Sequence, residues 1–278
     1  MKVSVAIADA KAEPFAFVVW RGFAESMEKA AQLGYQGVEL ALRSREDIDA
    51  DELRSLLKKY KLEVSCISTG QVFASLGLTM TDVDDDRRGR AVQVLSGLVE
   101  LASEFGGMVN LGRVRGFVAE GRDIEHTETL FLDSLGKLLP LAEKHGVLLV
   151  VEPVNRYETN FINSLPECAV LLKKVGSVQI GIMADVFHMN IEDARIGETI
   201  VECASMLRYV HLADSNRLAP GWGHLDFGEV FGALGQCGYN GWMTVECLPH
   251  PTPDAAARQA MEFLLPMVRA YNNAKRRI

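Results

Sequence analysis

The sequence has few cysteines and no long apolar run. Its five cysteines are odd in number and scattered, and they form no C-x-x-C pair, so neither a disulfide framework nor a zinc knuckle is indicated. This cysteine usage fits a reducing, cytoplasmic setting. The N-terminal stretch has no apolar segment of secretory length, and no later stretch reaches the roughly 18 apolar residues of a membrane span. We therefore expect no targeting signal and no contact with a membrane.

Positive charge is also scarce. The chain carries 29 Lys and Arg against 37 Asp and Glu, a formal charge of −8 at pH 7. Binding to DNA or RNA depends largely on the neutralisation of phosphates, so nucleic acid is a poor partner for this protein. With 48% hydrophobic and 24% charged residues, the composition is instead typical of a globular protein with a large buried core.

Short apolar runs alternate with longer segments of helical period along the whole chain. This alternation is the pattern of a parallel sheet built from βα units, and eight units can be counted. The expected strands are Val3–Ile7, Gly37–Ala41, Glu63–Ser68, Met108–Leu111, Val147–Glu152, Gln179–Met183, Tyr209–Leu212 and Trp242–Cys247. The expected helices are Phe23–Leu33, Asp51–Tyr60, Arg87–Phe105, Thr127–His145, Pro166–Val175, Gly197–Met206, Phe227–Cys237 and Asp254–Tyr271.

The length of 278 residues is compatible with one or two domains. No break in composition and no Pro/Gly/Ser-rich linker divides the chain, and the phrases QLGYQGVEL and QCGYNGWMTVE repeat one helix-stop, turn and strand-start pattern near its two ends. These features favour one closed barrel over a doubly wound open sheet. We therefore predict an α/β protein, a single (β/α)8 TIM barrel that spans residues 1–278.

Four polar side chains interrupt the apolar pattern near the C-terminal ends of the last four expected strands. They are Glu152, Asp185, His211 and Glu246, spaced by 33, 26 and 35 residues. Equivalent positions on consecutive barrel strands point to the same mouth, so we expect these side chains to converge. Any one of them alone would more often be a helix-cap or salt-bridge partner. Together, however, three carboxylates without a cation would repel one another, so a bound metal is the simplest explanation.

An oxygen-rich set with one imidazole and no thiolate suits Mn²⁺, Co²⁺ or Mg²⁺. We predict one divalent metal ion, with Mn²⁺ as the first choice. In the loops beyond these strand ends, Glu158, His188 and Arg217 are placed to reach a small ligand. Arg217 is equally compatible with a structural pair to Asp214 or Glu158. His188 is either a donor to the substrate or a partner of a ligand carboxylate. Loop support is the preferred role for Asn155, Arg156 and Asn216.

The phrases VEPVNRYETNFINS, ADVFHMNIED, HLADSNRLAPGWGHLDF and TVECLP resemble, in order and spacing, those of the xylose isomerase-like TIM-barrel superfamily. Within it the chain is similar to the ketose 3-epimerases that act on D-tagatose and D-psicose, and the likeness is strongest from Glu152 to Glu246. The resemblance implies that Glu152, Asp185, His211 and Glu246 bind the metal. It also implies that Glu152 and Glu246 form the acid/base pair. It further implies that the substrate's carbonyl and hydroxyl end is held by Glu158, His188 and Arg217.

The chain departs from the free-sugar 3-epimerases at two places. Those enzymes carry a G-E-C-N-R phrase where this chain has ADSNR at 213–217, and a proline where it has Cys247. The wording here, including TGQ at 69–71 and GRVRG at 112–116, is closer to the branch acting on 5-keto-L-gluconate, a keto sugar acid. The implied partner is therefore a small keto sugar or keto sugar acid. Relatives also imply a homo-oligomer, either a dimer or a tetramer.

The chemistry of such a substrate explains the residue set. The proton on a hydroxyl-bearing carbon beside a ketone is too weakly acidic for rapid loss unless the developing enediolate is stabilised, which a metal can do. Inversion then needs acid/base groups on opposite faces, the roles we assign to Glu152 and Glu246. The alternative is an aldose–ketose isomerase on the same barrel, in which one base can suffice.

Two further classes fit the sequence less well. A DNA-repair endonuclease on this barrel would need a multi-zinc cluster with more histidines than the six present, and a less acidic chain. A sugar-sensing or scaffold protein with a vestigial site would not explain an intact set of metal ligands.

The earlier loops are expected to contact the far end of the substrate. Candidates are Phe15, Phe17, Trp20, Gln71, Phe73, Arg113 and Arg115. The aromatic residues are equally compatible with packing at the barrel rim. A guanidinium can hold a carboxylate in a bidentate grip, which makes Arg113 a candidate partner for a keto sugar acid. A solvated loop charge is the alternative for both arginines.

Overall fold

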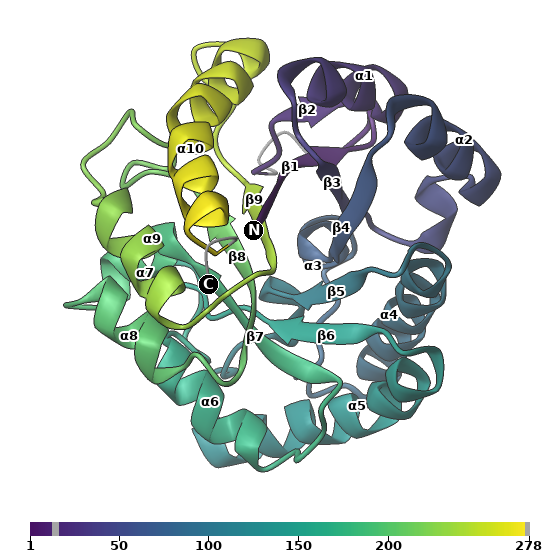
Figure 1. Cartoon of the computed structure of the whole chain (residues 1–278). Coiled ribbons are helices and arrows are strands. Elements are labelled where there is room, and N and C mark those ends of the chain that lie inside the picture. The colour runs from purple at the N-terminus through teal and green to yellow at the C-terminus, as the bar shows by residue number, and fades with distance from the viewer. Residues whose placement is uncertain (13–16, 276–278) are drawn as a thin grey trace.

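Neighbouring strands pair in parallel around the sheet until the last strand meets the first. The computed structural model describes residues 1–12 and 17–275. Pairing of β1 with β9 closes the barrel (Figure 1). Its strands are β1 (Lys2–Ala8), β3 (Gly37–Ala41), β4 (Glu63–Ser68), β5 (Met108–Leu111), β6 (Leu148–Val151), β7 (Ile180–Asp185), β8 (Leu207–Leu212) and β9 (Trp242–Val245). A two-residue strand, β2 (Trp20–Arg21), extends the edge of β1. The predicted (β/α)8 barrel is confirmed.

Helices surround the barrel as an outer ring (Figure 1). They are α1 (Phe23–Leu33), α2 (Ala50–Tyr60), α4 (Asp85–Phe105), α5 (Ile124–His145), α6 (Leu165–Lys173), α8 (Ile196–Glu202), α9 (Phe227–Gln236) and α10 (Pro253–Lys275). Several of them begin where an aspartate accepts a hydrogen bond from a free N–H of the first turn. Asp84 does so for α4 and Asp123 for α5, so both helices begin two or three residues before the predicted positions.

Two short helices follow strand ends and were not predicted. They are α3 (Gly70–Leu76) after β4 and α7 (Val186–Glu192) after β7, each of seven residues. Asp185 ends β7 and also caps α7, because its carboxylate accepts a hydrogen bond from the Phe187 N–H. Two single turns of 3-10 helix, η1 (Arg45–Asp47) and η2 (Arg113–Arg115), lie in the loops after β3 and β5.

Side chains along each strand alternate between the barrel interior and the helix layer. Val150, Met183 and Tyr209 pack together apart from the main core between sheet and helices. These residues lie two positions before Glu152, Asp185 and His211, respectively. Because side chains two positions apart on a strand point to the same face, the three site residues also face the barrel interior. The predicted strand ends differ slightly from the observed ones. Glu152 and Glu246 directly follow the last residues of β6 and β9.

A chain of hydroxyl groups crosses the deeper interior. Ser4 Oγ and Thr244 Oγ1 are 2.6 Å apart, Thr244 also bonds to the Tyr209 hydroxyl, and Tyr209 donates to Ser65 Oγ at 2.7 Å. Ser65 donates in turn to the Val38 carbonyl at 3.2 Å. These hydroxyls are buried and all have partners, so this layer of the barrel is polar but complete.

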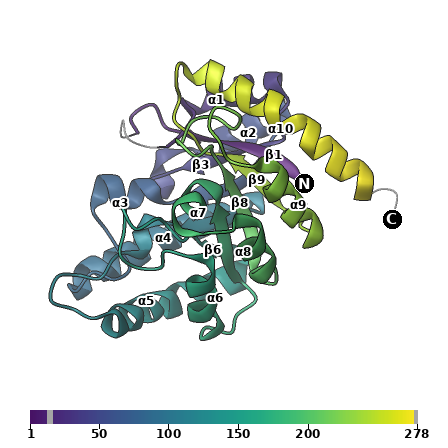
Figure 2. The same cartoon turned by 90° about the vertical axis from the view of Figure 1, so that its left-hand side faces the viewer.

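The C-terminal helix α10 lies beside α1 and α9 and completes the outer ring (Figure 1). In the side view, α3 lies on the opposite side of the molecule from the two chain ends (Figure 2). Across the described ranges, no helix is both long enough and apolar enough to cross a lipid bilayer.

Candidate active site

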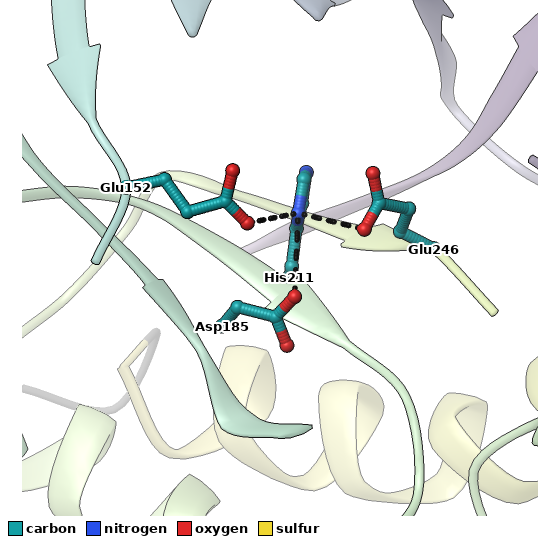
Figure 3. A group of neighbouring side chains, drawn as sticks. All are labelled: Glu152, Asp185, His211 and Glu246. Atoms are coloured by element: carbon teal, nitrogen blue, oxygen red, sulfur yellow. Dashed lines mark ion pairs between the residues drawn. The ribbon is translucent and has the colours of Figure 1, made fainter. Parts of the chain in front are cut away.

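The structure brings the four predicted metal-ligating residues together at the barrel mouth (Figure 3). One ligand atom from each of Glu152, Asp185, His211 and Glu246 lies within 4.8 Å of all the others. The first two carboxylates and the imidazole are buried, and Glu246 is partly exposed. Two ligands on opposite sides of one divalent ion are about 4 to 5 Å apart, so this spacing suits a single ion.

The His211 imidazole lies between the carboxylates (Figure 3). Its Nδ1 atom is 3.4 Å from Glu152 Oε1, 3.4 Å from Glu246 Oε2 and 3.8 Å from Asp185 Oδ2. No described residue forms a hydrogen bond with this buried nitrogen. The two glutamates approach from opposite sides of the ring and the aspartate from a third side (Figure 3).

Glu39 orients the imidazole from behind. This fully buried residue of β3 lies 2.9 and 3.1 Å from His211 Nε2 through its two carboxylate oxygens. The carboxylate only accepts, so the bond places a proton on Nε2 and leaves the Nδ1 lone pair facing the three other carboxylates. A histidine that ligates a metal commonly makes this second bond. Sequence reasoning missed Glu39, although a charged residue inside the apolar run GVELA is the signal that would have found it.

The charge balance of the cluster also favours a cation. Burial alone would lower the pKa of His211, but the carboxylates of Glu39, Glu246, Asp185 and Glu152 outweigh it and raise that pKa well above its usual range. Positive charge at Nδ1 is therefore strongly favoured, and either a proton or a divalent ion supplies it. Three carboxylates and an imidazole lone pair without a hydrogen bond fit a divalent ion such as Mn²⁺, Co²⁺ or Mg²⁺.

Arg217 pairs with two of the four clustered residues. Its Nη1 atom is 2.5 Å from Asp185 Oδ2, and its Nη2 atom bonds to Glu246 Oε2. The guanidinium lies between the rings of Phe17 and Phe187, 4.8 and 4.7 Å from their centroids. Burial alone would raise the pKa of Asp185, but Arg217 and other nearby positive charge lower it well below its usual range. The alternative of a structural pair between Arg217 and Asp214 or Glu158 is not what the structure shows, because the guanidinium pairs with Asp185 and Glu246.

Asp214 instead shapes the loop that carries Arg217. Its buried carboxylate accepts hydrogen bonds from the N–H groups of Ser215, Gly221 and Leu225 at 2.8, 2.8 and 3.1 Å. Arg217 itself has a φ of 61°, a left-handed conformation that is uncommon for residues other than glycine. A loop tied at three points can hold this conformation and present the guanidinium to the cluster.

Glu158 and His188 are joined through Asn155. The Asn155 Nδ2 atom is 2.7 Å from His188 Nδ1 and 3.0 Å from Glu158 Oε1. The other nitrogen of His188, Nε2, faces the cluster at 3.6 Å from Asp185 Oδ2 and 4.0 Å from Glu152 Oε1. Asn155 therefore supports this part of the site.

The other two residues assigned to loop support lie farther from the cluster. Arg156 forms an ion pair with Glu192 at 2.6 Å, and Asn216 bonds to the Trp222 carbonyl at 2.9 Å.

Glu152 is held at its second oxygen by Asn110 of β5. The Asn110 Nδ2 atom donates to Glu152 Oε2 at 2.9 Å, while Oε1 faces His211. Burial alone would raise the pKa of Glu152, but the adjacent imidazole lowers it. Sequence reasoning missed Asn110 as well. An amide on the interior-facing side of the strand MVNL is the signal that identifies it.

A cavity with about 620 Å³ of empty space, its open mouth included, lies over the cluster. Among the predicted residues, its lining includes Phe17, Gln71, Arg113, Glu152, Glu158, His188, Arg217 and Glu246. Arg113 stacks on the ring of Phe73, 4.7 Å from its centroid, so Phe73 supports the wall from behind.

Two of the residues predicted to contact the far end of the substrate do not line the cavity, and a third lies outside the described residues. Trp20 is buried at the rim, where its Nε1 donates to Asp254 Oδ1 at 2.7 Å, so it packs and does not line the cavity. Arg115 is fully buried and donates to the main-chain carbonyls of Gly112, Phe161 and Ile162 at 2.8–2.9 Å. It is therefore neither a substrate contact nor a solvated charge. Phe15 lies outside the described residues.

Comparison with known proteins decides the family. A family model for the xylose isomerase-like TIM barrel matches residues 27–267. The chain belongs to this family. A ketose 3-epimerase from Arthrobacter globiformis is 30% identical, over 82% of this chain and 81% of that protein. A 3-dehydro-D-guloside 4-epimerase from Escherichia coli K12 is 25% identical, over 80% and 86% of the two chains.

The resemblance inferred from the motifs is therefore confirmed, and the protein is an isomerase-class enzyme of the ketose 3-epimerase type. Solved structures support the fold. A D-allulose 3-epimerase from Methylomonas sp. in complex with D-allulose superimposes with a TM-score of 0.82, covering 96% of this chain and 97% of that one at 23% identity.

Proposed function

We propose that this protein is a divalent-metal-dependent epimerase that inverts the hydroxyl-bearing carbon beside the ketone of a ketohexose or a keto sugar acid such as 5-keto-L-gluconate. The single observation that carries the proposal is the approach of Glu152 and Glu246 from opposite sides of His211 (Figure 3). Two carboxylates so placed can serve the two faces of one planar intermediate, as inversion requires.

Under this proposal Glu152, Asp185, His211 and Glu246 hold one divalent ion, with Mn²⁺ as the first choice and Co²⁺ or Mg²⁺ as alternatives. A bound ion supplies Lewis acidity and stabilises the negative charge that develops on the substrate oxygens. Glu39 keeps the His211 lone pair directed at that position, through its bond to Nε2.

The proton transfers are assigned to the two glutamates. One removes the proton from the carbon beside the ketone, and the other delivers a proton to the opposite face. The enediolate between the two steps is a planar anion, and Arg217 lies close enough to Glu246 and Asp185 to stabilise negative charge there. Glu158 and His188, joined through Asn155, are assigned to the substrate's carbonyl and hydroxyl end.

Isotope incorporation tests the reaction. In D₂O, epimerisation of D-fructose, D-tagatose or 5-keto-L-gluconate by two bases gives a product with solvent deuterium at the inverted carbon. An isomerase with one base would instead give an aldose. With a substrate deuterated at the carbon that loses its proton, it would move that deuterium to the adjacent carbon. Detection of the aldose with retained label would contradict the proposal.

The substrate's far end is assigned to Gln71 and Arg113, which line the cavity from the loops after β4 and β5. The stacked Arg113 guanidinium suits a carboxylate, which favours a keto sugar acid. Arg113→Ala should lower kcat/KM for 5-keto-L-gluconate about tenfold or more, and change that for D-fructose much less. A native preference for the neutral sugar would exclude the acid.

Three properties of the whole protein belong to the same proposal. We assign residues 1–278 to one domain and the active form to a homo-oligomer, a dimer or a tetramer, as the family resemblance implies. The five cysteines are all unpaired, which supports work in the reducing cytoplasm. Light scattering of the purified protein measures the oligomeric state directly.

A further inference from the structure

Asn110 has an unused acceptor in the wall of the candidate active site. Its side chain is 2% exposed and lines the cavity. The bond from its Nδ2 to Glu152 Oε2 fixes the amide orientation, because a carboxylate can only accept. The amide oxygen Oδ1 is buried and has no hydrogen-bond partner among the described residues. Buried polar atoms are nearly always paired, so this orphan atom calls for a ligand group.

Gly112 keeps the approach to this oxygen open. A Cβ atom at position 112 would lie 2.7 Å from Glu152 Oε2 and 3.4 Å from Asn110 Oδ1. Both oxygens therefore border the same space, which an ordinary side chain at this position would fill. Because Gly112, Asn110 and Glu152 all line the cavity, a ligand that enters it can reach both oxygens.

The chemistry of Oδ1 restricts what it can bind. An amide oxygen only accepts hydrogen bonds, so its partner must be a donor. A carboxylate or a ketone oxygen would not pair with it, whereas each hydroxyl of a sugar can donate. Glu152 Oε2, which the same side chain holds, belongs to one of the two groups assigned to proton transfer.

We infer that Asn110 is a substrate-binding residue that accepts a hydrogen bond from a hydroxyl of the keto sugar, beyond the carbon that loses its proton; this rests on the proposed function. One amide then bonds to both the base and the substrate, so it fixes their relative position. The hydroxyl contact lowers KM, and the alignment raises kcat, because both partners are held by one rigid group.

Deoxy sugars test the inference. We would measure kcat/KM of the Mn²⁺-loaded wild type and of Asn110→Leu with D-fructose and with its 4-deoxy, 5-deoxy and 6-deoxy analogues. The wild type should lose about 10- to 100-fold on the analogue that lacks the bonded hydroxyl. Asn110→Leu should lose a similar factor on D-fructose and should no longer discriminate against that analogue. If the variant discriminates against every analogue as strongly as the wild type, the inference is overturned.

Two further variants separate this role from a structural one. If Asn110→Leu fails to fold, the smaller variant Asn110→Ala takes its place, and it should likewise no longer discriminate against the analogue that lacks the bonded hydroxyl. Ser68→Ala is the control, because it changes another polar residue of the cavity wall, at the end of β4. It should discriminate between D-fructose and the deoxy analogues as the wild type does. Because Asn110 also holds the metal-ligating Glu152, every variant is assayed at saturating Mn²⁺, and discrimination between D-fructose and an analogue is a ratio that a weaker metal site alone would leave unchanged.

Failure of the proposed function is distinguishable. If the wild type converts neither these sugars nor D-tagatose nor 5-keto-L-gluconate, the proposed reaction is wrong, and the inference is then measured by calorimetric binding of D-fructose. Weaker binding to Asn110→Leu than to the wild type would support it. Equal binding, or no binding to the wild type, would overturn it.

Discussion

Two polar clusters lie in the interior of one barrel and differ in how their polar groups are paired. In the deeper cluster, the hydroxyls of Ser4, Thr244, Tyr209 and Ser65 bond to one another and to a main-chain carbonyl. At the mouth, three carboxylates crowd His211, whose Nδ1 atom has no hydrogen-bond partner among the described residues. The first cluster is neutral and complete, and the second is charged and incomplete.

This difference distinguishes polar residues that stabilise the fold from polar residues that bind a ligand. A fully bonded buried network stabilises one arrangement of the fold. Crowded carboxylates destabilise the folded state, and a cation that binds them only in the folded state stabilises it. Substitutions in the deep cluster should therefore change stability more than chemistry, and substitutions at the mouth should do the reverse.

The largest effect is expected at Glu246. Glu246→Gln keeps the size of the side chain but removes its ability to exchange a proton, so kcat should fall by about 10³-fold or more. In the metal-free protein, removal of one of several crowded carboxylates should leave the melting temperature unchanged or higher. Steady-state kinetics of the Mn²⁺-loaded variant and thermal unfolding of the metal-free variant measure the two quantities.

Tyr209→Phe is the matched control in the deep cluster. Loss of the phenol leaves the hydroxyls of Ser65 and Thr244 without their partner, so the free energy of unfolding should fall by about 1–3 kcal/mol. Its kcat should stay within a few-fold of the wild type. Comparable kcat losses in the two variants would remove the distinction between the clusters.

Metal removal is the second test. Dialysis against a chelator should abolish activity and lower the melting temperature, and added Mn²⁺ should restore both. At 100 times its Kd, an ion that binds only the folded state adds about 2.7 kcal/mol of stability. Asp185→Asn should lose most of this Mn²⁺-dependent shift, whereas Tyr209→Phe should keep it. An equal shift in both variants would place the ion elsewhere.

Glu39 is a buried residue of the barrel interior that bonds to the mouth cluster through His211. Glu39→Gln weakens this bond and releases the imidazole orientation, so Mn²⁺ affinity by calorimetry should fall about 10- to 100-fold. The control is Glu63→Gln, an exposed glutamate of the neighbouring strand paired with Lys2 at 2.6 Å. Unchanged Mn²⁺ affinity of Glu39→Gln would show that the imidazole needs no such support.

The barrel and the four clustered residues could be predicted because both depend on regular spacing. Strands buried on two faces are continuous apolar runs, and a charged residue at the end of such a run stands out. Glu152, Asp185 and Glu246 were visible for this reason. Glu39 and Asn110 were missed because they lie inside strands, where one polar residue among apolar ones is easily assigned to packing.

The remaining errors come from contacts between distant segments. Arg115 bonds to carbonyls more than 40 residues away along the chain, and no local pattern indicates such partners. Arg217 reaches Asp185 and Glu246 from a loop that has a left-handed residue at this position and that Asp214 holds by hydrogen bonds, and no local pattern indicates these contacts. The short helix α7 was missed because it has only seven residues, too few for a helical period to be distinct.

The smallest expected effect concerns a carboxylate that lacks the cationic partners of Asp185. Asp193 is half-buried, burial raises its pKa to about 6, and its Oδ2 atom has no hydrogen-bond partner among the described residues. A raised folded-state pKa means that the folded protein binds this proton more tightly than the unfolded chain does. The protein therefore loses stability as the pH rises from about 4 through 6. Asp193→Asn removes this loss, so it should stabilise the protein at pH 8 by at most about 1 kcal/mol after solvent screening, and by less at pH 4.5. Urea unfolding at the two pH values measures the difference. If Asp193→Asn changes the free energy of unfolding equally at pH 8 and pH 4.5, the ionised Asp193 carboxylate does not destabilise the folded protein.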